Sequence, residues 1–182
     1  DITDPIIENK GSIYQYVGDE VSISWLNTPE NKYHCLHFVK QAVEAIERRE
    51  VHYLQTYGFA PRFKTGIHAG DVTAGYIGII KKELVFSGDT LYTTARNRSM
   101  CNELGCSYVM TNDFLGGMKN TNGFVIREIG ETGFRGREEK EQLFSLQLSW
   151  LPLLNLCIRS IVFPVKQLLA TATPSNIRFQ FN

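Results

Sequence analysis

Two adjacent carboxylates, Asp19 and Glu20, stand between two strand-like runs near the start of the sequence. Residues 13–17 before them and 21–25 after them alternate in the period-two pattern of half-buried strands. The pair Gly18-Asp19 between these runs predicts a tight hairpin loop. Turn tips are solvated and favour Asp, so solvation alone explains one acid here. Two interpretations therefore stay open: a solvated turn, and chemistry that needs a carboxylate fixed at a hairpin tip.

A second set of candidate residues lies on a predicted helix that follows the residues Ser-Gly-Asp. The run TLYTTARNRSMCNELG predicts a helix with Asp89 as its N-cap and Gly105 as its end. Tyr92 and Arg96 are four residues apart, so they share one face of that helix. For Arg96 the alternative to a functional role is an ordinary surface ion pair. For Tyr92 the alternative is an aromatic side chain packed in the core.

The histidines and cysteines give little support for a zinc site or a disulfide framework. His34 and His37 stand three residues apart on a predicted helix, but no third ligand candidate lies near them in the sequence. The cysteines form no Cys-x-x-Cys pair, which favours a reducing compartment and predicts a cytoplasmic location. They are Cys35, Cys101, Cys106 and Cys157.

Composition predicts one main globular domain. The chain has 182 residues, of which 43% are hydrophobic and 21% charged, so it is long enough for one sizeable core. Nineteen basic residues balance 19 acidic ones, so no overall field attracts nucleic acid or an anionic membrane. Any phosphate binding must therefore be local.

The elements that must position the candidate residues alternate between hairpins and helices. Thr28-Pro29 begins a predicted amphipathic helix over residues 28–54, and the segment RFKTGIHAG predicts a strand with a close backbone approach at its glycines. TAGYIGIIKKELVFS predicts two strands around a turn, and SYVMT, GFVIREIG and EQLFSLQL predict three more. We therefore expect an α+β fold with one sheet and packed helices.

The two ends of the chain differ from this pattern. DITDPIIENKG predicts a short helix that ends at Gly11, and its abrupt start suggests that natural sequence precedes it. Residues 151–169 are apolar but are interrupted by Pro152, Arg159, Pro164 and Lys166. This interruption favours a broken amphipathic helix over a membrane span.

Four motifs in order resemble the catalytic domain of class III adenylate/guanylate cyclases. They are YVGDE, FKTGIHAGDVTAGYIG, LVFSGDTLYTTARNRSMCNELG and GFRGREEKEQLFSL. The resemblance implies a ferredoxin-like, palm-type domain over residues 1–150, and it leaves a tail of unassigned role over residues 151–182. GDE alone would also suit the related diguanylate cyclases, but GIHAG and GDTLYTTAR resemble only the purine cyclases.

The resemblance implies the conversion of ATP, or less readily GTP, to the 3′,5′-cyclic monophosphate and pyrophosphate. Asp19 resembles one of two aspartates that hold a pair of Mg²⁺ or Mn²⁺ ions, and Glu20 is expected to be a solvent-facing neighbour. A homodimer is expected, because active sites in this family are built at the subunit interface. Any membrane attachment is expected only through a segment outside this chain.

Four more positions carry roles by resemblance. Arg96 matches an arginine that stabilises charge on the transferred phosphorus, whereas Tyr92 stands where an asparagine orients the ribose. Arg135 and Arg137 resemble a basic loop that holds the terminal phosphates, with a solvated charge run as the alternative.

The residues at the base-reading positions, Gln15 and Val85, are ambiguous. Adenylate cyclases usually have lysine with aspartate or threonine at these positions, and guanylate cyclases have glutamate with cysteine. Gln15 can hydrogen-bond either purine, and Val85 can only pack. We favour ATP because neither residue resembles the guanine-reading glutamate.

One expected feature has no counterpart in the sequence. In the family, the other metal-binding aspartate lies on a strand that precedes the first helix, and that strand would lie between the Asp19 hairpin and the FKTGIHAG strand. We therefore expect this chain alone to be inactive unless another acid, such as Asp71 or Glu20, completes the metal site. The alternative function is a non-catalytic dimerisation or nucleotide-sensing module, which Tyr92, Gln15 and Val85 also suggest.

Overall fold

A four-stranded sheet organises the part of the chain that the computed structural model describes, residues 1–118, 121, 123–133 and 140–148. Its strand order is β3 (Thr65–Ile67), β6 (Tyr108–Thr111), β8 (Lys140–Leu148) and β7 (Phe124–Gly133). The pair β3–β6 is parallel, and the pairs β6–β8 and β7–β8 are antiparallel. All four residues of β6 are buried, so the centre of the sheet is part of the core.

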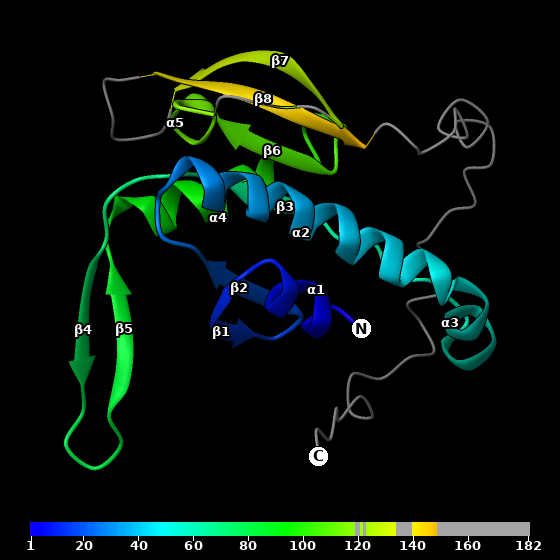
Figure 1. The fold of residues 1–182 in the computed structure, drawn as a ribbon, viewed down its shortest axis with the longest axis horizontal. Helices are drawn as coiled ribbons and strands as arrows, with labels where there is room; N and C mark the ends of the chain where they lie inside the picture. Colours follow the sequence, from blue (N-terminus) through cyan, green and yellow to red (C-terminus); the bar gives the residue numbers. More distant parts are fainter. Residues whose placement is uncertain (119–120, 122, 134–139, 149–182) are drawn as a thin grey trace. The chain divides into compact units, whose positions relative to one another are not determined.

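Five helices accompany the strands of the described chain: α1 (Thr3–Glu8), α2 (Pro29–Arg48), α3 (Glu50–Tyr57), α4 (Asp89–Met100) and α5 (Asn112–Leu115). The longest, α2, and the site-bearing α4 lie on the same side of strands β6, β8 and β7 (Figure 1). The α+β fold class is thereby confirmed.

Local signals explain where α2 begins but not where it ends. The Thr28 hydroxyl accepts a hydrogen bond from the Asn31 amide at 3.2 Å, and Pro29 occupies the first helical position. The prediction of one helix to residue 54 is wrong, because the helix breaks at Arg49 and continues as α3. The Arg49 guanidinium and the Tyr53 hydroxyl both bind the Asp1 carboxylate, a tertiary contact that the helical periodicity does not reveal.

Two hairpins stand apart from the four-stranded sheet. The first consists of β1 (Ser12–Val17) and β2 (Glu20–Ser24), with Gly18 and Asp19 as its loop, and the second of β4 (Thr73–Ile77) and β5 (Glu83–Ser87). Gly18 has a φ of 60°, as the first central residue of a type II′ turn requires. Both hairpins were predicted, but the single sheet was not observed: the described strands form three sheets.

Strand β3 is one edge of the four-stranded sheet, and neither hairpin pairs with it. Among the described strands β3 pairs only with β6, so its other edge carries no partner. The family resemblance predicts one more strand between the Asp19 hairpin and β3, and that strand stays a prediction. The described strands differ from the single sheet that the sequence analysis expected, because neither hairpin is hydrogen-bonded to the four-stranded sheet.

The helix α4 begins and ends differently from the prediction. Its N-cap is Gly88, and Asp89 is the first helical residue, where its carboxylate complements the helix dipole. The regular helix stops at Met100, and the chain turns at Gly105, whose φ is 63°. The Cys106 amide donates to the Cys101 carbonyl at 3.1 Å, as in a Schellman motif.

A close backbone contact joins α4 to β3 at Gly66. A Cβ atom at Gly66 would lie 2.3 Å from the Thr94 carbonyl oxygen and 2.4 Å from the Arg98 amide nitrogen. Next to this contact, the fully buried Asn97 donates from Nδ2 to the Ile67 carbonyl at 3.3 Å. The close backbone approach predicted for the GIHAG segment is confirmed.

A buried lysine joins α2 to the short helix α5. Lys32 is 9% exposed, and its Nζ donates to the Asp113 carbonyl at 3.0 Å and to the Gly116 carbonyl at 2.6 Å. Burial lowers the pKa of Lys32. The two carbonyls lie on α5 and at its C-cap, where a cation is favoured.

The described residues include no helix with the length and apolar character to cross a bilayer. The amphipathic helix expected over residues 151–169 lies outside the described residues.

Replacing Gly66 by alanine tests the contact between α4 and β3. The atoms that a new Cβ would meet belong to the backbone of α4, so they cannot move aside cheaply. We expect Gly66→Ala to lower the free energy of unfolding by about 3 kcal/mol, as severe overpacking does. Urea denaturation measures this loss.

The matched control is Gly75→Ala, because a Cβ at this strand glycine meets no atom within 4 Å. Equal unfolding midpoints for the two variants would contradict the close approach of α4 to β3.

Candidate active site

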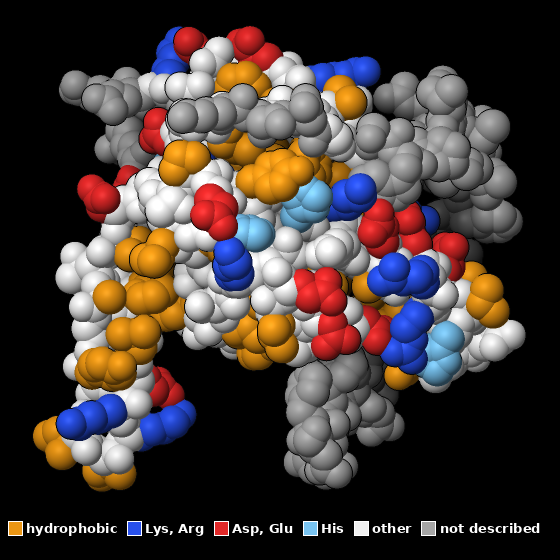
Figure 2. Space-filling model, viewed as in Figure 1, with side chains coloured by type: hydrophobic (Ala, Val, Ile, Leu, Met, Phe, Trp, Pro, Cys, Tyr) orange, Lys and Arg blue, Asp and Glu red, His pale blue; other side chains and the backbone are white. Residues whose placement is uncertain are grey.

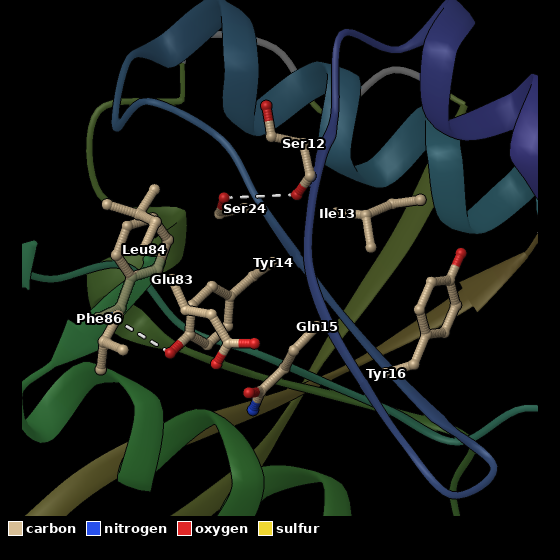
Figure 3. Close-up of a pocket in the computed structure, with 10 residues that line it drawn as sticks. Ser12, Ile13, Tyr14, Gln15, Tyr16, Ser24, Glu83, Leu84 and Phe86 are labelled. Atoms are coloured by element: carbon tan, nitrogen blue, oxygen red, sulfur yellow. Dashed lines mark hydrogen bonds between the residues drawn. The ribbon is translucent and has the colours of Figure 1, made fainter. Parts of the chain in front are cut away.

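A pocket of about 510 Å³ opens between the two hairpins (Figure 3). Its lining comes from residues 12–16 and Ser24 on the first hairpin and from residues 83–86 on the second. Gln15 and Val85, the two residues predicted at base-reading positions, both belong to this lining. The structure thus brings together two residues that are 70 positions apart in the sequence.

An aromatic contact fixes one hairpin against the other. The rings of Tyr14 and Phe86 stack with centroids 4.5 Å apart and an interplanar angle of 13°. The Phe86 amide donates to the Tyr14 hydroxyl oxygen at 3.0 Å, the dashed line between these residues in Figure 3. This stack joins β1 to β5, which belong to different sheets, on one side of the pocket.

The hairpin that carries Asp19 is anchored at its base and near its tip. At the base, the Trp25 indole donates to the Asn9 carbonyl at 2.8 Å and its ring lies 5.7 Å from that of Phe38 on α2. Near the tip, Glu20 Oε2 lies 3.1 Å from Arg98 Nε on α4. Both contacts come from the β2 side of the hairpin, and they leave the Asp19 side chain exposed on its loop.

Glu20, expected to be a solvent-facing neighbour of Asp19, keeps a partly exposed carboxylate but also has a partner on α4. Its carboxylate pairs with Arg98, and the two side chains are 36% and 48% exposed respectively. An ion pair as exposed as this one contributes less than about 1 kcal/mol to stability. Its effect is positional, because it connects the hairpin tip to α4.

The helix α4 presents its two candidate residues differently. Tyr92 is 52% exposed, so the alternative of an aromatic packed in the core is wrong. Arg96, one turn later, is half-buried. Thr93 and Asn97 are buried, so the face of α4 that carries these two residues packs against the protein interior.

The structure therefore unites only part of the predicted site. Gln15 and Val85 share the pocket, whereas Asp19, Tyr92 and Arg96 lie on elements joined to it but not in its lining. Arg135 and Arg137 lie outside the described residues.

Two residues at this site escaped the sequence analysis. Glu83 lines the pocket, and Arg98 holds the hairpin that carries Asp19. Glu83 could have been found from its spacing, because it lies two residues before Val85 on one strand and therefore on the same strand face. No sequence signal pairs Arg98 with Glu20.

The described residues provide one ligand for a metal site, but they do not form a complete site for two ions. Asp19 offers a hard oxygen ligand of the kind that Mg²⁺ and Mn²⁺ prefer. Glu20 faces Arg98, and the described residues contain no group of three or more histidine, cysteine, aspartate or glutamate side chains able to hold a metal. Two neighbouring divalent ions need more negative charge than one carboxylate supplies.

One curated protein resembles the chain in sequence. This protein, Adenylate cyclase 2 of Rhizobium meliloti strain 1021, is 30% identical over 146 residues. The match covers 80% of this chain but only 40% of that relative's length. No family model matches the chain.

Solved structures of both adenylyl and guanylyl cyclases share the fold. CyaB from P. aeruginosa superposes with a TM-score of 0.68 at 15% identity, covering 80% of this chain and 76% of that one. The guanylyl cyclase Cya2 superposes with a TM-score of 0.65 at 15% identity, covering 80% and 74%. The guanylate cyclase domain of RhGC from Catenaria anguillulae, in complex with GTP, gives 0.59 at 18% identity, covering 81% and 78%.

These neighbours include enzymes for both purines, so the fold alone does not distinguish ATP from GTP. The sequence match, the shared fold and the order of the motifs agree with one another. The chain is a homologue of adenylate and guanylate cyclases and belongs to the class III nucleotidyl cyclase catalytic-domain family.

Proposed function

We propose that the chain carries the nucleotide-binding half of a purine nucleotidyl cyclase that prefers ATP to GTP. The observation that supports this most directly is the shared pocket of Gln15 and Val85 between β1 and β5. A pocket of about 510 Å³ is in the size range of small-molecule sites. Val85 packs on the face of the base, and the Gln15 amide hydrogen-bonds its edge.

The proposed reaction is an intramolecular displacement at the α-phosphorus. The ribose 3′-oxygen forms a bond to this phosphorus, the bond to the bridging oxygen of pyrophosphate breaks, and the hydroxyl proton is released. Arg96 donates from its planar guanidinium to the oxygens of the phosphoryl group in transfer, where negative charge accumulates. Tyr92, exposed one turn earlier, is proposed to contact the ribose.

Asp19 is proposed as one ligand of the Mg²⁺ or Mn²⁺ ions that would neutralise charge on the phosphates. The described residues do not complete that site, so a further acid is needed, and the open edge of β3 is the place where we expect it. The proposed compartment is the cytoplasm, which suits free thiols such as Cys35, Cys101 and Cys106.

A homodimer is proposed from the surface of the β4–β5 hairpin. Large exposed apolar side chains lie along this hairpin, residues 73–87, which we call the β4–β5 arm. Figure 2 shows hydrophobic side chains along its length. Ile79 and Ile80 at its tip are 98% and 103% exposed. Fully exposed isoleucines on a projecting hairpin are costly in water unless another surface covers them, and we take that surface to be a second copy of the chain.

The second candidate function is a non-catalytic nucleotide-sensing or dimerisation module in signal transduction. The exposed Tyr92, in place of the ribose-orienting amide, favours it. It is also favoured because the described residues offer only one carboxylate, that of Asp19, to the proposed metal site. The two functions can be distinguished by one product, because only the cyclase releases a cyclic nucleotide.

The first prediction concerns catalysis by Arg96. When ATP and Mn²⁺ are supplied to a longer form of the protein, extended by natural sequence before Asp1, mass spectrometry should detect cyclic AMP. This chain alone should produce far less cyclic AMP. In the active form, Arg96→Ala should raise the barrier by about 2.7–4 kcal/mol, as loss of one preorganised donor does. Affinity for a non-hydrolysable ATP analogue should change little.

Arg127→Ala is the control, because Arg127 is an exposed arginine on β7. Arg96→Ala with normal turnover and weaker substrate binding would contradict the role of Arg96. The absence of cyclic nucleotide from every form would favour the non-catalytic module.

A second prediction concerns metal binding by Asp19. Asp19→Asn removes the charged ligand but keeps the side-chain shape, so Mn²⁺ affinity should fall while the fold stays intact. Electron paramagnetic resonance of free Mn²⁺ in the presence of ATP measures this loss. Asp4→Asn is the control, because Asp4 is an exposed aspartate on α1. An equal loss of Mn²⁺ affinity in the two variants would sink the assignment.

A third prediction concerns the β4–β5 arm. Replacing Ile79 and Ile80 together by lysine should shift the chain from dimer to monomer, because the exposed apolar tip is lost. Sedimentation velocity measures the shift. Val51 and Leu54 on α3 are also exposed, at 67% and 50%, so their double lysine variant is the control. Equal association of all three proteins would rule out this interface.

A further inference from the structure

Two cysteines at the C-terminal end of α4, Cys101 and Cys106, lie against each other. Both are free thiols. The Cys106 amide donates to the Cys101 carbonyl at 3.1 Å, so a backbone hydrogen bond closes the loop over residues 101–106. Cys106 packs against the apolar cluster that contains Cys101, and the two thiols hydrogen-bond. The two sulfur atoms are therefore neighbours within one short loop.

The backbone of this loop suits a disulfide. A disulfide requires Cα atoms about 4.4–6.8 Å apart and Cβ atoms that face each other. A hydrogen bond from the amide of one cysteine to the carbonyl of the other is compatible with that separation. A Schellman-type helix end also commonly brings the side chains at these two positions into contact. Cross-linking the two cysteines therefore needs no large movement of the backbone.

The two thiols differ in their access to solvent. Cys106 is half-buried, whereas Cys101 is only 1% exposed. Cys101 Sγ lies within 3.7 Å of three backbone carbonyl oxygens, those of Thr65, Asn97 and Ser107. These contacts hold the buried sulfur in place behind Cys106. A small oxidant in solution therefore reaches Cys106 first, and Cys101 is placed to react with it from the interior.

Burial and one lysine act in opposite directions on the two thiols. Burial raises the pKa of Cys106, and it raises the pKa of Cys101 to about 11. The positive charge of Lys64 opposes this rise in both pKa values. Lys64 Nζ donates to the side chain of Asn102, which lies between the two cysteines in the sequence. Both thiols are mainly protonated at neutral pH, so the pair stays reduced until an oxidant is supplied.

We propose that Cys101 and Cys106 form a redox-sensitive modification site, at which a peroxide converts the two thiols to an intramolecular disulfide. The disulfide cross-links the C-terminal end of the helix that carries Arg96 and Arg98. Disulfides of this transient kind also occur in reducing compartments. The inference does not depend on the proposed function, because neither cysteine is among the described residues that line the nucleotide pocket.

The oxidation proceeds in two balanced steps. In the first, the Cys106 sulfur attacks one oxygen of hydrogen peroxide, so an S–O bond forms, the O–O bond breaks, and the released hydroxide takes the thiol proton to form water. In the second, the Cys101 sulfur attacks the sulfur of the Cys106 sulfenic acid, so the S–S bond forms and the oxygen leaves as water with the Cys101 proton. The two thiols lose two electrons and two protons, and the peroxide becomes two molecules of water.

The test treats the intact chain with hydrogen peroxide, alkylates the remaining thiols in denaturant and digests the product with trypsin. Residues 99–119 contain both cysteines and no lysine or arginine before Lys119, so the two cysteines stay in one peptide. Mass spectrometry should find no alkylated cysteine in this peptide before reduction by dithiothreitol, and two alkylated cysteines after it. Free thiols should fall from the four of the untreated chain to two.

Two variants identify the cysteines that react. Cys106→Ser keeps the size of the side chain, and its Cys101 should remain open to alkylation after the same treatment, because the oxidant reaches Cys106 first. Cys157→Ser is the matched control, because it removes a cysteine distant in sequence and should leave the disulfide unchanged. A parent peptide that stays fully alkylated would overturn the proposal, and so would a disulfide that joins Cys106 to Cys157.

Amide hydrogen exchange tests the effect on α4. The Leu104 amide donates to the Met100 carbonyl at 3.0 Å, and the Cys106 amide donates to the Cys101 carbonyl, so these two amides report on the helix end. Both should exchange more slowly in the oxidised chain, because a cross-link restricts the opening of the loop. The amides of α2 should exchange at the same rate in both forms. Equal exchange of the Leu104 and Cys106 amides in the two forms would contradict cross-linking of the helix end.

Discussion

The close approach of α4 to β3 at Gly66 is the contact on which the rest of the site depends. Because Gly66 has no side chain, the backbone of α4 lies directly on the strand, and Asn97 adds a buried hydrogen bond to Ile67. This contact determines where α4 presents Arg96 and Arg98. Arg98 in turn holds Glu20, so the position of the Asp19 loop depends on a glycine in another element.

Side chains, and not sheet hydrogen bonds, join the two hairpins to the rest of the described chain. The Tyr14–Phe86 stack joins one hairpin to the other, and the Glu20–Arg98 pair joins the first hairpin to α4. Such contacts allow a pocket to form between β1 and β5 without merging them into one sheet. Among the described strands, the same arrangement leaves one edge of β3 without a partner.

The sequence predicted those features that depend on local patterns or on ordered motifs. Alternation and turn residues predicted both hairpins, and motif spacing predicted that Gln15 and Val85 act together, which agrees with their shared pocket. Features that depend on tertiary proximity were missed. The break at Arg49 coincides with binding to Asp1, and the partner of Glu20 comes from 78 residues away. Residues Arg135 and Arg137 lie outside the described residues, so their predicted role stays a prediction.

The central claim is that a purine nucleotide binds between β1 and β5. Nuclear magnetic resonance of the ¹⁵N-labelled chain, titrated with a non-hydrolysable ATP analogue and Mg²⁺, tests it most directly. The account predicts that the largest amide shifts fall on residues 12–16 and 83–86, the two segments that line the pocket. Saturable shifts confined to other elements, with these two segments unmoved, would contradict it.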